Sequence, residues 1–228
     1  MEKIKIIGIN VGSGGNSITG RGFFNTKDKT FCYIPIEEDE KQNNKFTFKD
    51  LNNPFIKNAL EKPCHYDPEF ITNTYGHIKR GFGDHILYKP DLLEDSNVYL
   101  FFYSTLNINH NPEKWGIFII GFFEIEKIIN TKKLSDEQIL SLSDFKNNAH
   151  LRREKPKVDL LIKGTSNSKL FKQAIQLSKL GDTNEINPKF ADLIMTVSGK
   201  RIIKNSSWHR WVFYSESPIF LDTLKRQE

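Results

Sequence analysis

The chain has 228 residues, of which 38% are hydrophobic and 27% are charged, a balance typical of one globular domain. No apolar run approaches the ~20 residues that a membrane-spanning helix needs, and the first five residues lack the apolar core of a signal peptide. We therefore expect a cytoplasmic protein that does not enter a membrane, with two reduced thiols at Cys32 and Cys64.

The formal net charge of +5 is distributed unevenly along the chain. Residues 1–145 carry 17 Lys and Arg against 20 Asp and Glu, whereas residues 146–228 carry 16 against 8. A positive field confined to the last third favours a phosphate-bearing partner. The alternative is a solvated lysine-rich surface.

The first third of the chain predicts two strands with irregular segments after them. Residues 3–9 alternate and are β-branched, which predicts a strand, and residues 30–36 predict a second one. The glycine-rich residues 10–22 between them cannot be regular structure. Pro54 suggests the start of a short helix, and residues 63–83 have no clear period, a property of many functional segments.

The middle of the chain predicts a central antiparallel pair of strands. These strands cover residues 97–103 and 116–129, with residues 104–115 as the loop between them. A capping box at residues 135–138 predicts a helix start, and residues 158–162 predict a further strand.

The last quarter predicts two helices and a final strand. Apolar spacing indicates a helix over residues 168–177, Asn187-Pro188 opens another, and residues 208–213 form the strand. Because strands and helices mix without regular alternation, we expect one α+β domain over residues 1–228, with a central, largely antiparallel sheet and helices packed around it.

The glycine-rich segment follows a strand, as a phosphate-binding loop would. It lacks the Gly-Lys-Ser/Thr ending of a Walker loop and the spacing of a dinucleotide fingerprint. Close approach to a DNA backbone and a flexible hairpin loop both remain open, with Arg21 placed at the exit to meet an anion.

Residues 64–68 place a thiol, an imidazole and a carboxylate together, in the sequence Cys-His-Tyr-Asp-Pro. No helix-borne, activated thiolate is indicated, which disfavours a cysteine nucleophile. Metal binding by Cys64, His65 and Asp67 lacks an assigned fourth ligand. Asp67 can act as a general base or cation stabiliser near His65, or it can form a simple Asp-Pro turn.

A second Asp-His pair, Asp84-His85, precedes an apolar stretch. Asp84 is either a second catalytic carboxylate or, by the plainer interpretation, a helix cap.

The most distinctive string is residues 147–153, Asn-Asn-Ala-His-Leu-Arg-Arg. Asn can pair with a base edge and Arg with phosphate or guanine. The alternative is a helix C-terminus carrying cations.

Residues 204–211 interleave Trp208 and Trp211 with basic groups. Such a set stacks bases and neutralises phosphates, or places a Trp pair in the core with polar groups outward.

The order of several short motifs resembles the nucleotide modification associated domain 3 family over roughly residues 8–213. The motifs are Gly20-Arg21-Gly22, Ile34-Pro35-Ile36, His65-Tyr66-Asp67-Pro68, the strand at residues 98–103, Gly121-Phe122-Phe123, Asn148-Ala149-His150, Gly164-Thr165-Ser166 and the segment 170–174. The chain departs from the family pattern in the acidic and Asn-rich stretch 37–53. The resemblance implies action on hypermodified DNA bases, with removal of such bases by a glycosylase.

The hypothesis that follows is a DNA glycosylase acting on a flipped, hypermodified base, for example glucosylated hydroxymethylcytosine, in anti-phage defence. We expect a cationic pocket where residues around 21, 67 and 148–153 converge. Asp67 would stabilise the oxocarbenium-like sugar, with Asp84 as the second choice and His150 or His65 assisting the leaving base. The predicted substrate-binding residues are Gly20, Arg21, His65, Tyr103, Asn148, Arg152, Arg153, Trp208 and Arg210.

The expected partner is DNA with modified bases, such as phage DNA, with no obligate protein partner and no metal or cofactor. A non-catalytic reader of modified bases, which would use an aromatic cage, is the main alternative. A transferase that installs a base modification is another, for which no donor-binding fingerprint is visible.

Overall fold

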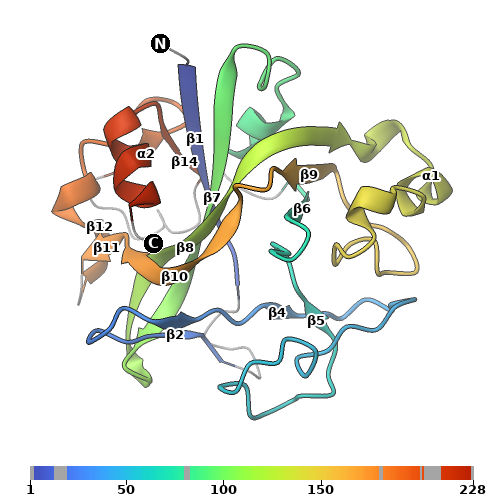
Figure 1. Cartoon of the computed structure of the whole chain (residues 1–228), viewed down its shortest axis with the longest axis horizontal. Helices are drawn as coiled ribbons and strands as arrows, with labels where there is room; N and C mark the ends of the chain where they lie inside the picture. The colour runs from blue at the N-terminus through green and yellow to red at the C-terminus, as the bar shows by residue number, and fades with distance from the viewer. Residues whose placement is uncertain are drawn as a thin grey trace.

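The computed structural model describes residues 3–12, 20–79, 83–179, 182–200, 202 and 212–226. Its centre is a long hairpin of two strands, β7 (Ser96–Ile108) and β8 (Asn111–Asn130), which runs across the middle of the molecule (Figure 1). Asn109 and His110 turn the hairpin with φ values of 50° and 62°, the left-handed region that Asn tolerates well. The predicted loop at residues 104–115 is therefore wrong, since most of it continues the ladder, with Thr105 opposite Ile117 and Asn107 opposite Trp115.

A mixed sheet is built outward from this hairpin. Strand β1 lies parallel to β7, and every other neighbouring pair along the main path is antiparallel. The path runs β13 (Met195–Thr196), β14 (Phe213–Ser215), β1 (Lys3–Asn10), β7, β8, β9 (Leu160–Gly164) and β6 (Thr74–His77).

Shorter strands extend or flank this sheet. Strand β10 (Lys169–Gln176) also pairs with β8, and β2 (Phe23–Phe24) pairs with β7 and with β3 (Phe31–Cys32). Two small separate ribbons are β4 (Ile36–Glu37) with β5 (Cys64–His65), and β11 (Ser178–Lys179) with β12 (Asp182–Ile186).

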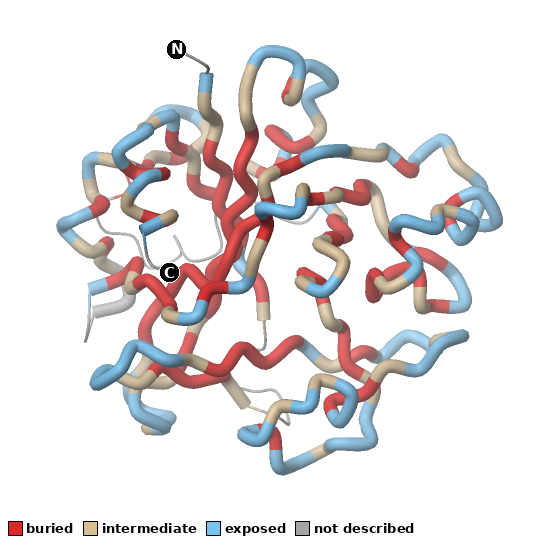
Figure 2. Tube along the Cα trace, viewed as in Figure 1, coloured by how far each residue is buried: buried red, intermediate tan, exposed pale blue. Residues whose placement is uncertain are grey.

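Both faces of the hairpin are buried, so its strands are apolar on both sides (Figure 2). Along β7, Leu100 and Phe102 pack into one core cluster, whereas Phe101 and Tyr103 pack into the cluster on the opposite face. The candidate site lies on the first of these faces, which also holds Tyr75.

The predicted α+β class, with helices packed around an antiparallel sheet, is wrong. Strands make up 40% of the structure and helical segments 14%. Among the described residues the two α-helices are short, α1 (Asp136–Leu140) and α2 (Pro218–Lys225), and the sheet is mixed because β1 runs parallel to β7. Neither helix has the length and apolar character needed to cross a membrane.

The helix predicted over residues 168–177 is strand β10. Its register against β8 shifts between Leu170 and Ile175, so the buried residues Phe171, Ala174 and Ile175 fall at spacings that imitate a helical face. Pairing with the free edge of β8 decides the conformation, and this long-range contact is invisible in a local pattern.

The other local predictions have mixed outcomes. Ser135 and Gln138 form the predicted capping box of α1. Asn187 caps a short 3₁₀ turn, η4 (Pro188–Phe190), instead of a longer helix. The expected helix after Pro54 is a series of turns, and the 3₁₀ turns η2 (Thr131–Lys133) and η3 (Ser143–Phe145) flank α1.

Candidate functional site

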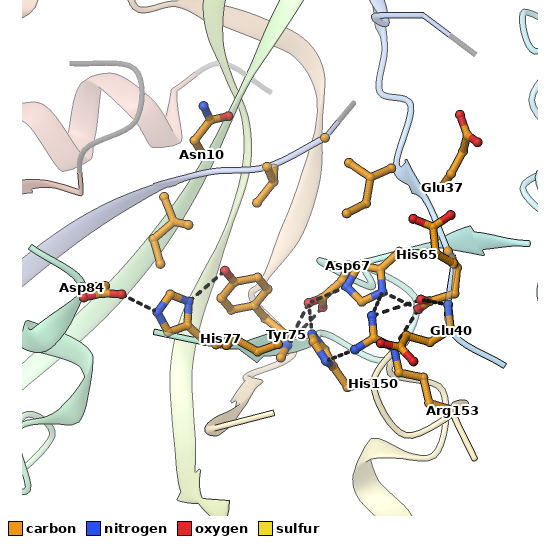
Figure 3. Close-up of a pocket in the computed structure, with 18 of the residues that line it drawn as sticks. Asn10, Glu37, Glu40, His65, Asp67, Tyr75, His77, Asp84, His150 and Arg153 are labelled. Carbon is orange, nitrogen blue, oxygen red and sulfur yellow. Dashed lines mark hydrogen bonds and ion pairs between the residues drawn. The ribbon is translucent and has the colours of Figure 1, made fainter. Parts of the chain in front are cut away.

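A pocket with a volume of about 490 Å³ opens beside the end of β1. This volume is within the range of ~300–1,000 Å³ typical of small-molecule sites. Segments far apart in the sequence meet there (Figure 3), namely residues 9–12, 36–40 and 75–78 together with His65, Asp67, Asp84, His150, Arg153 and Val212.

Three buried side chains, His65, Asp67 and His150, converge on one point of the pocket wall. Nε2 of His150 lies 3.5 Å from Oδ2 of Asp67, and Nε2 of His65 lies 3.8 Å from the same oxygen. One potential ligand atom from each residue falls within 4.8 Å of the other two. His65 comes from β5, Asp67 from the turn after it, and His150 from the loop after η3.

The Asp67 carboxylate is held in place by a strand and a loop. The backbone N–H of Gly76 in β6 lies 3.1 Å from both carboxylate oxygens, and the amide of Asn148 donates to Oδ1 at 3.1 Å. Asn148 is fully buried, and its own carbonyl oxygen accepts from the backbone N–H of His150 at 3.1 Å. Asn148 therefore ties Asp67 to His150.

Both histidines are oriented through their Nδ1 atoms. Nδ1 of His65 lies 2.8 Å from Oε2 of Glu38, and Nδ1 of His150 lies 2.6 Å from the backbone carbonyl of Lys157. A carboxylate and a carbonyl only accept hydrogen bonds, whereas the Arg153 guanidinium, 3.2 Å from each Nδ1, only donates. Because the contacts to Glu38 and to Lys157 are the shorter ones, we assign the ring proton of each histidine to Nδ1. With the ring proton on Nδ1, Nε2 of His150 faces Asp67; burial lowers the pKa of His150, although Asp67 opposes this shift.

Glu38 forms a buried fork with Arg153 beside the two histidines. Nε of Arg153 donates to Oε2 at 2.9 Å, and a terminal nitrogen donates to Oε1 at 3.1 Å. Burial alone would raise the pKa of Glu38, but hydrogen bonds from His65 and Arg153 lower it to about 2. Glu38 thus carries a charge that Arg153 balances.

A second His-carboxylate pair stands at the other end of the pocket (Figure 3). Nε2 of His77 lies 3.4 Å from Oδ2 of Asp84, and the hydroxyl of Tyr75 lies 3.2 Å from Nδ1 of His77. Burial lowers the pKa of His77, with Asp84 opposing the shift. Asp84 is the first residue of the 3₁₀ turn η1 (Asp84–Tyr88), and the N-cap position belongs to Gly83, so the interpretation of Asp84 as the cap residue is wrong.

The pocket is acidic. Among the described residues, six carboxylates line it and one guanidinium, that of Arg153, faces them. The carboxylates are those of Glu37, Glu38, Asp39, Glu40, Asp67 and Asp84. The exposed Lys157 pairs with Glu40 at 2.5 Å, which still leaves more carboxylates than cations on the described lining. Such a lining repels phosphate and favours a neutral or cationic group. The described lining residues therefore do not meet the expectation of a cationic pocket.

The structure brings together most of the predicted catalytic region. His65, Asp67, Asp84, His150 and Arg153 all line the pocket. Asn148 lies directly behind Asp67, where it positions the carboxylate rather than facing the cavity.

The other predicted residues lie elsewhere. The guanidinium of Arg21 stacks on Trp115, 4.6 Å from the ring centre, and that of Arg152 lies 4.2 Å from the Phe46 ring centre. Tyr103 is a fully buried core residue, stacked 5.7 Å from Phe213. Gly20 is not part of the pocket lining, and Trp208 and Arg210 lie outside the described residues.

Sequence reasoning missed Glu38, Tyr75, Gly76 and His77. The last three belong to the segment 63–83, whose irregularity marked it as functional without selecting residues. Glu38 belongs to an acidic stretch that the sequence presents as a surface turn. In the structure Glu38 is buried and paired with Arg153, a contact that no local pattern indicates.

The fold and the site together define a mixed β-sheet protein with a buried His-Asp-His cluster in an acidic pocket. The sequence matches the family described as nucleotide modification associated domain 3 over residues 5–226, and the chain belongs to that family. Searches of curated proteins and of solved structures return no match. Membership associates the chain with nucleotide modification and confirms the resemblance seen in the motif order.

Proposed function

We propose that the protein excises hypermodified bases from DNA by hydrolysing the N-glycosidic bond of a nucleotide extruded into this pocket. The observation that carries the proposal is the Asp67 carboxylate, fixed by Gly76 and Asn148 and flanked by two imidazoles on the pocket wall. Membership of a nucleotide modification family supports a nucleic-acid substrate.

The electrostatics of the pocket suit this reaction. Cleavage of a glycosidic bond passes through a positively charged, oxocarbenium-like sugar. A wall of carboxylates stabilises such a charge, whereas it repels the flanking phosphates, which would remain at the mouth of the pocket.

The proposed reaction is a single hydrolytic exchange. Water attacks C1′ of the sugar while the bond from C1′ to the base nitrogen breaks. An imidazole Nε2, of His150 or His65, accepts a proton from the water and returns it to the departing base. Asp67 stabilises the sugar cation and orients the water, and no redox change occurs.

The pocket lining favours chemistry over recognition alone. Tyr75 is the one Phe, Tyr or Trp among the described residues that line it, so these residues do not form an aromatic cage for a modified base. Buried, oriented titratable groups instead dominate the wall, as in catalytic sites.

The test is mass spectrometry of small products released from phage DNA with modified bases and from the same DNA without modification. The proposal predicts a free modified base and alkali-labile abasic sites from the modified DNA alone. Asp67→Asn should abolish release, and Asp91→Asn, a change at an exposed position, should not. Tight binding without release would identify a reader, and activity that requires an added donor would identify a transferase. Either result would overturn the proposal.

A further inference from the structure

The contacts around His65, Asp67 and His150 leave three electron-pair donors facing one another. With both Nδ1 protons engaged by Glu38 and by the Lys157 carbonyl, each Nε2 presents a lone pair to the Asp67 carboxylate. The separations of 3.5 and 3.8 Å are too long for good hydrogen bonds. Three buried acceptors directed at one point repel one another unless a positive charge lies between them.

We propose that Nε2 of His65, Nε2 of His150 and Oδ2 of Asp67 bind one divalent first-row transition-metal ion, such as Zn²⁺ or Fe²⁺. The three residues form a two-histidine, one-carboxylate set, whose nitrogen ligands suit these ions better than Mg²⁺ or Ca²⁺.

The distances fit such an ion. Ligand atoms at ~2.1 Å from a tetrahedral metal stand ~3.4 Å apart, by simple trigonometry on the usual bond lengths. The two separations from Asp67, 3.5 and 3.8 Å, lie within a few tenths of an ångström of this value, and the two imidazole nitrogens lie within 4.8 Å of each other.

The surroundings of the three ligands have the form of a metal site's outer shell. Metal-binding histidines usually donate the other ring N–H to a carboxylate or a backbone carbonyl, which fixes the ring and raises its basicity. Glu38 and the Lys157 carbonyl accept these protons here. Asn148 and the Gly76 N–H orient the carboxylate.

The excess of carboxylates in the described pocket lining also favours a bound cation. Six carboxylates face one guanidinium among the described lining residues, so a divalent cation lowers the electrostatic cost of burying them together. Three protein ligands leave at least one coordination position open to the cavity, as in catalytic rather than structural metal sites. A bound ion would occupy both Nε2 lone pairs, so it would replace the imidazoles as the group that activates the attacking water, by acidifying a water bound at that open position.

The site does not depend on which bond the protein cleaves, and it can be tested without DNA. Untagged protein, purified without chelators, is analysed for bound metals, which distinguishes zinc from iron. The chelated protein is then titrated with Co²⁺, whose visible absorption reports coordination. We expect one ion per folded chain.

The variants His65→Gln and His150→Gln should weaken Co²⁺ binding by at least about 100-fold, since loss of outer-shell partners alone commonly costs 10–100-fold. His77→Gln is the matched control, because His77 is a buried histidine beside a carboxylate in the same pocket but outside the cluster. Circular dichroism establishes that each variant is folded.

Folded wild-type protein that binds neither Zn²⁺, Fe²⁺ nor Co²⁺ would overturn the proposal, and so would a His77→Gln variant that loses binding as fully as His150→Gln. Base excision and metal binding can fail separately. A bound ion without base release would support the metal site and contradict the glycosylase proposal. Base release without a bound ion would contradict the metal site alone.

Discussion

The backbone N–H of Gly76 lies 3.1 Å from both carboxylate oxygens of Asp67, and this contact joins strand β6 to the cluster of candidate catalytic groups. The approach is so close that a Cβ atom on Gly76 would stand 2.2 Å from Cδ2 of His150 and 2.9 Å from its Nε2. Glycine is required here by space, and the same contact fixes both the carboxylate and the imidazole.

Gly76→Ala should therefore disable the site. The added methyl group must push His150 away from Asp67, and overpacking of this kind costs about 1–3 kcal/mol of stability. We expect loss of base release and of metal binding together with a modest decrease in the unfolding free energy, measured by urea denaturation. A Gly76→Ala protein with wild-type activity would contradict the geometry.

Asn148→Asp should destabilise the fold by about 2–4 kcal/mol, since it removes a buried hydrogen bond and opposes two carboxylates. The Asn148 amide donates to Asp67 from a fully buried position. The matched control is Asn147→Asp, one residue earlier and outside the pocket lining. Equal denaturation midpoints for the two variants would argue against a positioning role for Asn148.

Arg153→Met should cost about 3–5 kcal/mol because it leaves the Glu38 carboxylate buried without its partner. The double variant Glu38→Gln with Arg153→Met should recover part of this loss, since the unpaired charge is then absent. A double-mutant cycle of unfolding free energies measures the coupling. If the two single-variant changes in unfolding free energy simply add in the double variant, the ion pair between Glu38 and Arg153 does not stabilise the fold.

Glu124 should make the fold sensitive to acid. Burial would raise its pKa, but hydrogen bonds from Asn167, Thr165 and Tyr99 lower it below the usual 4.5. A depressed pKa in the folded state gives stability that is present above pH 4.5 and lost as the pH falls below it.

Glu124→Gln should therefore cost about 1–2 kcal/mol near neutral pH, below the full value of hydrogen bonds to a charged group because Glu124 is only partly buried and solvent screens it. The difference from wild type should shrink as the pH falls below 4.5, measured by urea unfolding across pH. Glu126→Gln, an exposed change on the same strand, is the control. If the difference in unfolding free energy between Glu124→Gln and wild type stays constant with pH, ionisation of Glu124 does not contribute to stability.

The two cysteines should be chemically inert in the folded protein. Burial raises the pKa of Cys64 to about 12 and also raises that of Cys32. We expect a thiol reagent at mildly alkaline pH to label neither residue in the native state and both after unfolding. Rapid labelling of Cys64 in the folded protein would contradict this expectation and make Cys64 a candidate nucleophile.

Local sequence information was sufficient where neighbours along the chain decide the structure. The alternation of residues 3–9 predicted strand β1, and the capping box at Ser135 predicted the start of α1. The chemistry-bearing types at His65, Asp67 and His150 were recognisable individually, because imidazole and carboxylate groups retain their functional chemistry in any fold.

Tertiary structure decided the grouping and the electrostatics. Asn148 reaches Asp67 across 81 residues and Arg153 reaches Glu38 across 115, and no pattern of local spacing encodes such pairs. Residues around 21, 67 and 148–153 were expected to converge in a cationic pocket, yet the acidic stretch 36–40 folds against the histidines and makes the described lining acidic. Sequence therefore determines which groups are available, whereas the pairing of distant strands and loops determines which charges share a cavity, because electrostatic energy depends on distance in space and on burial.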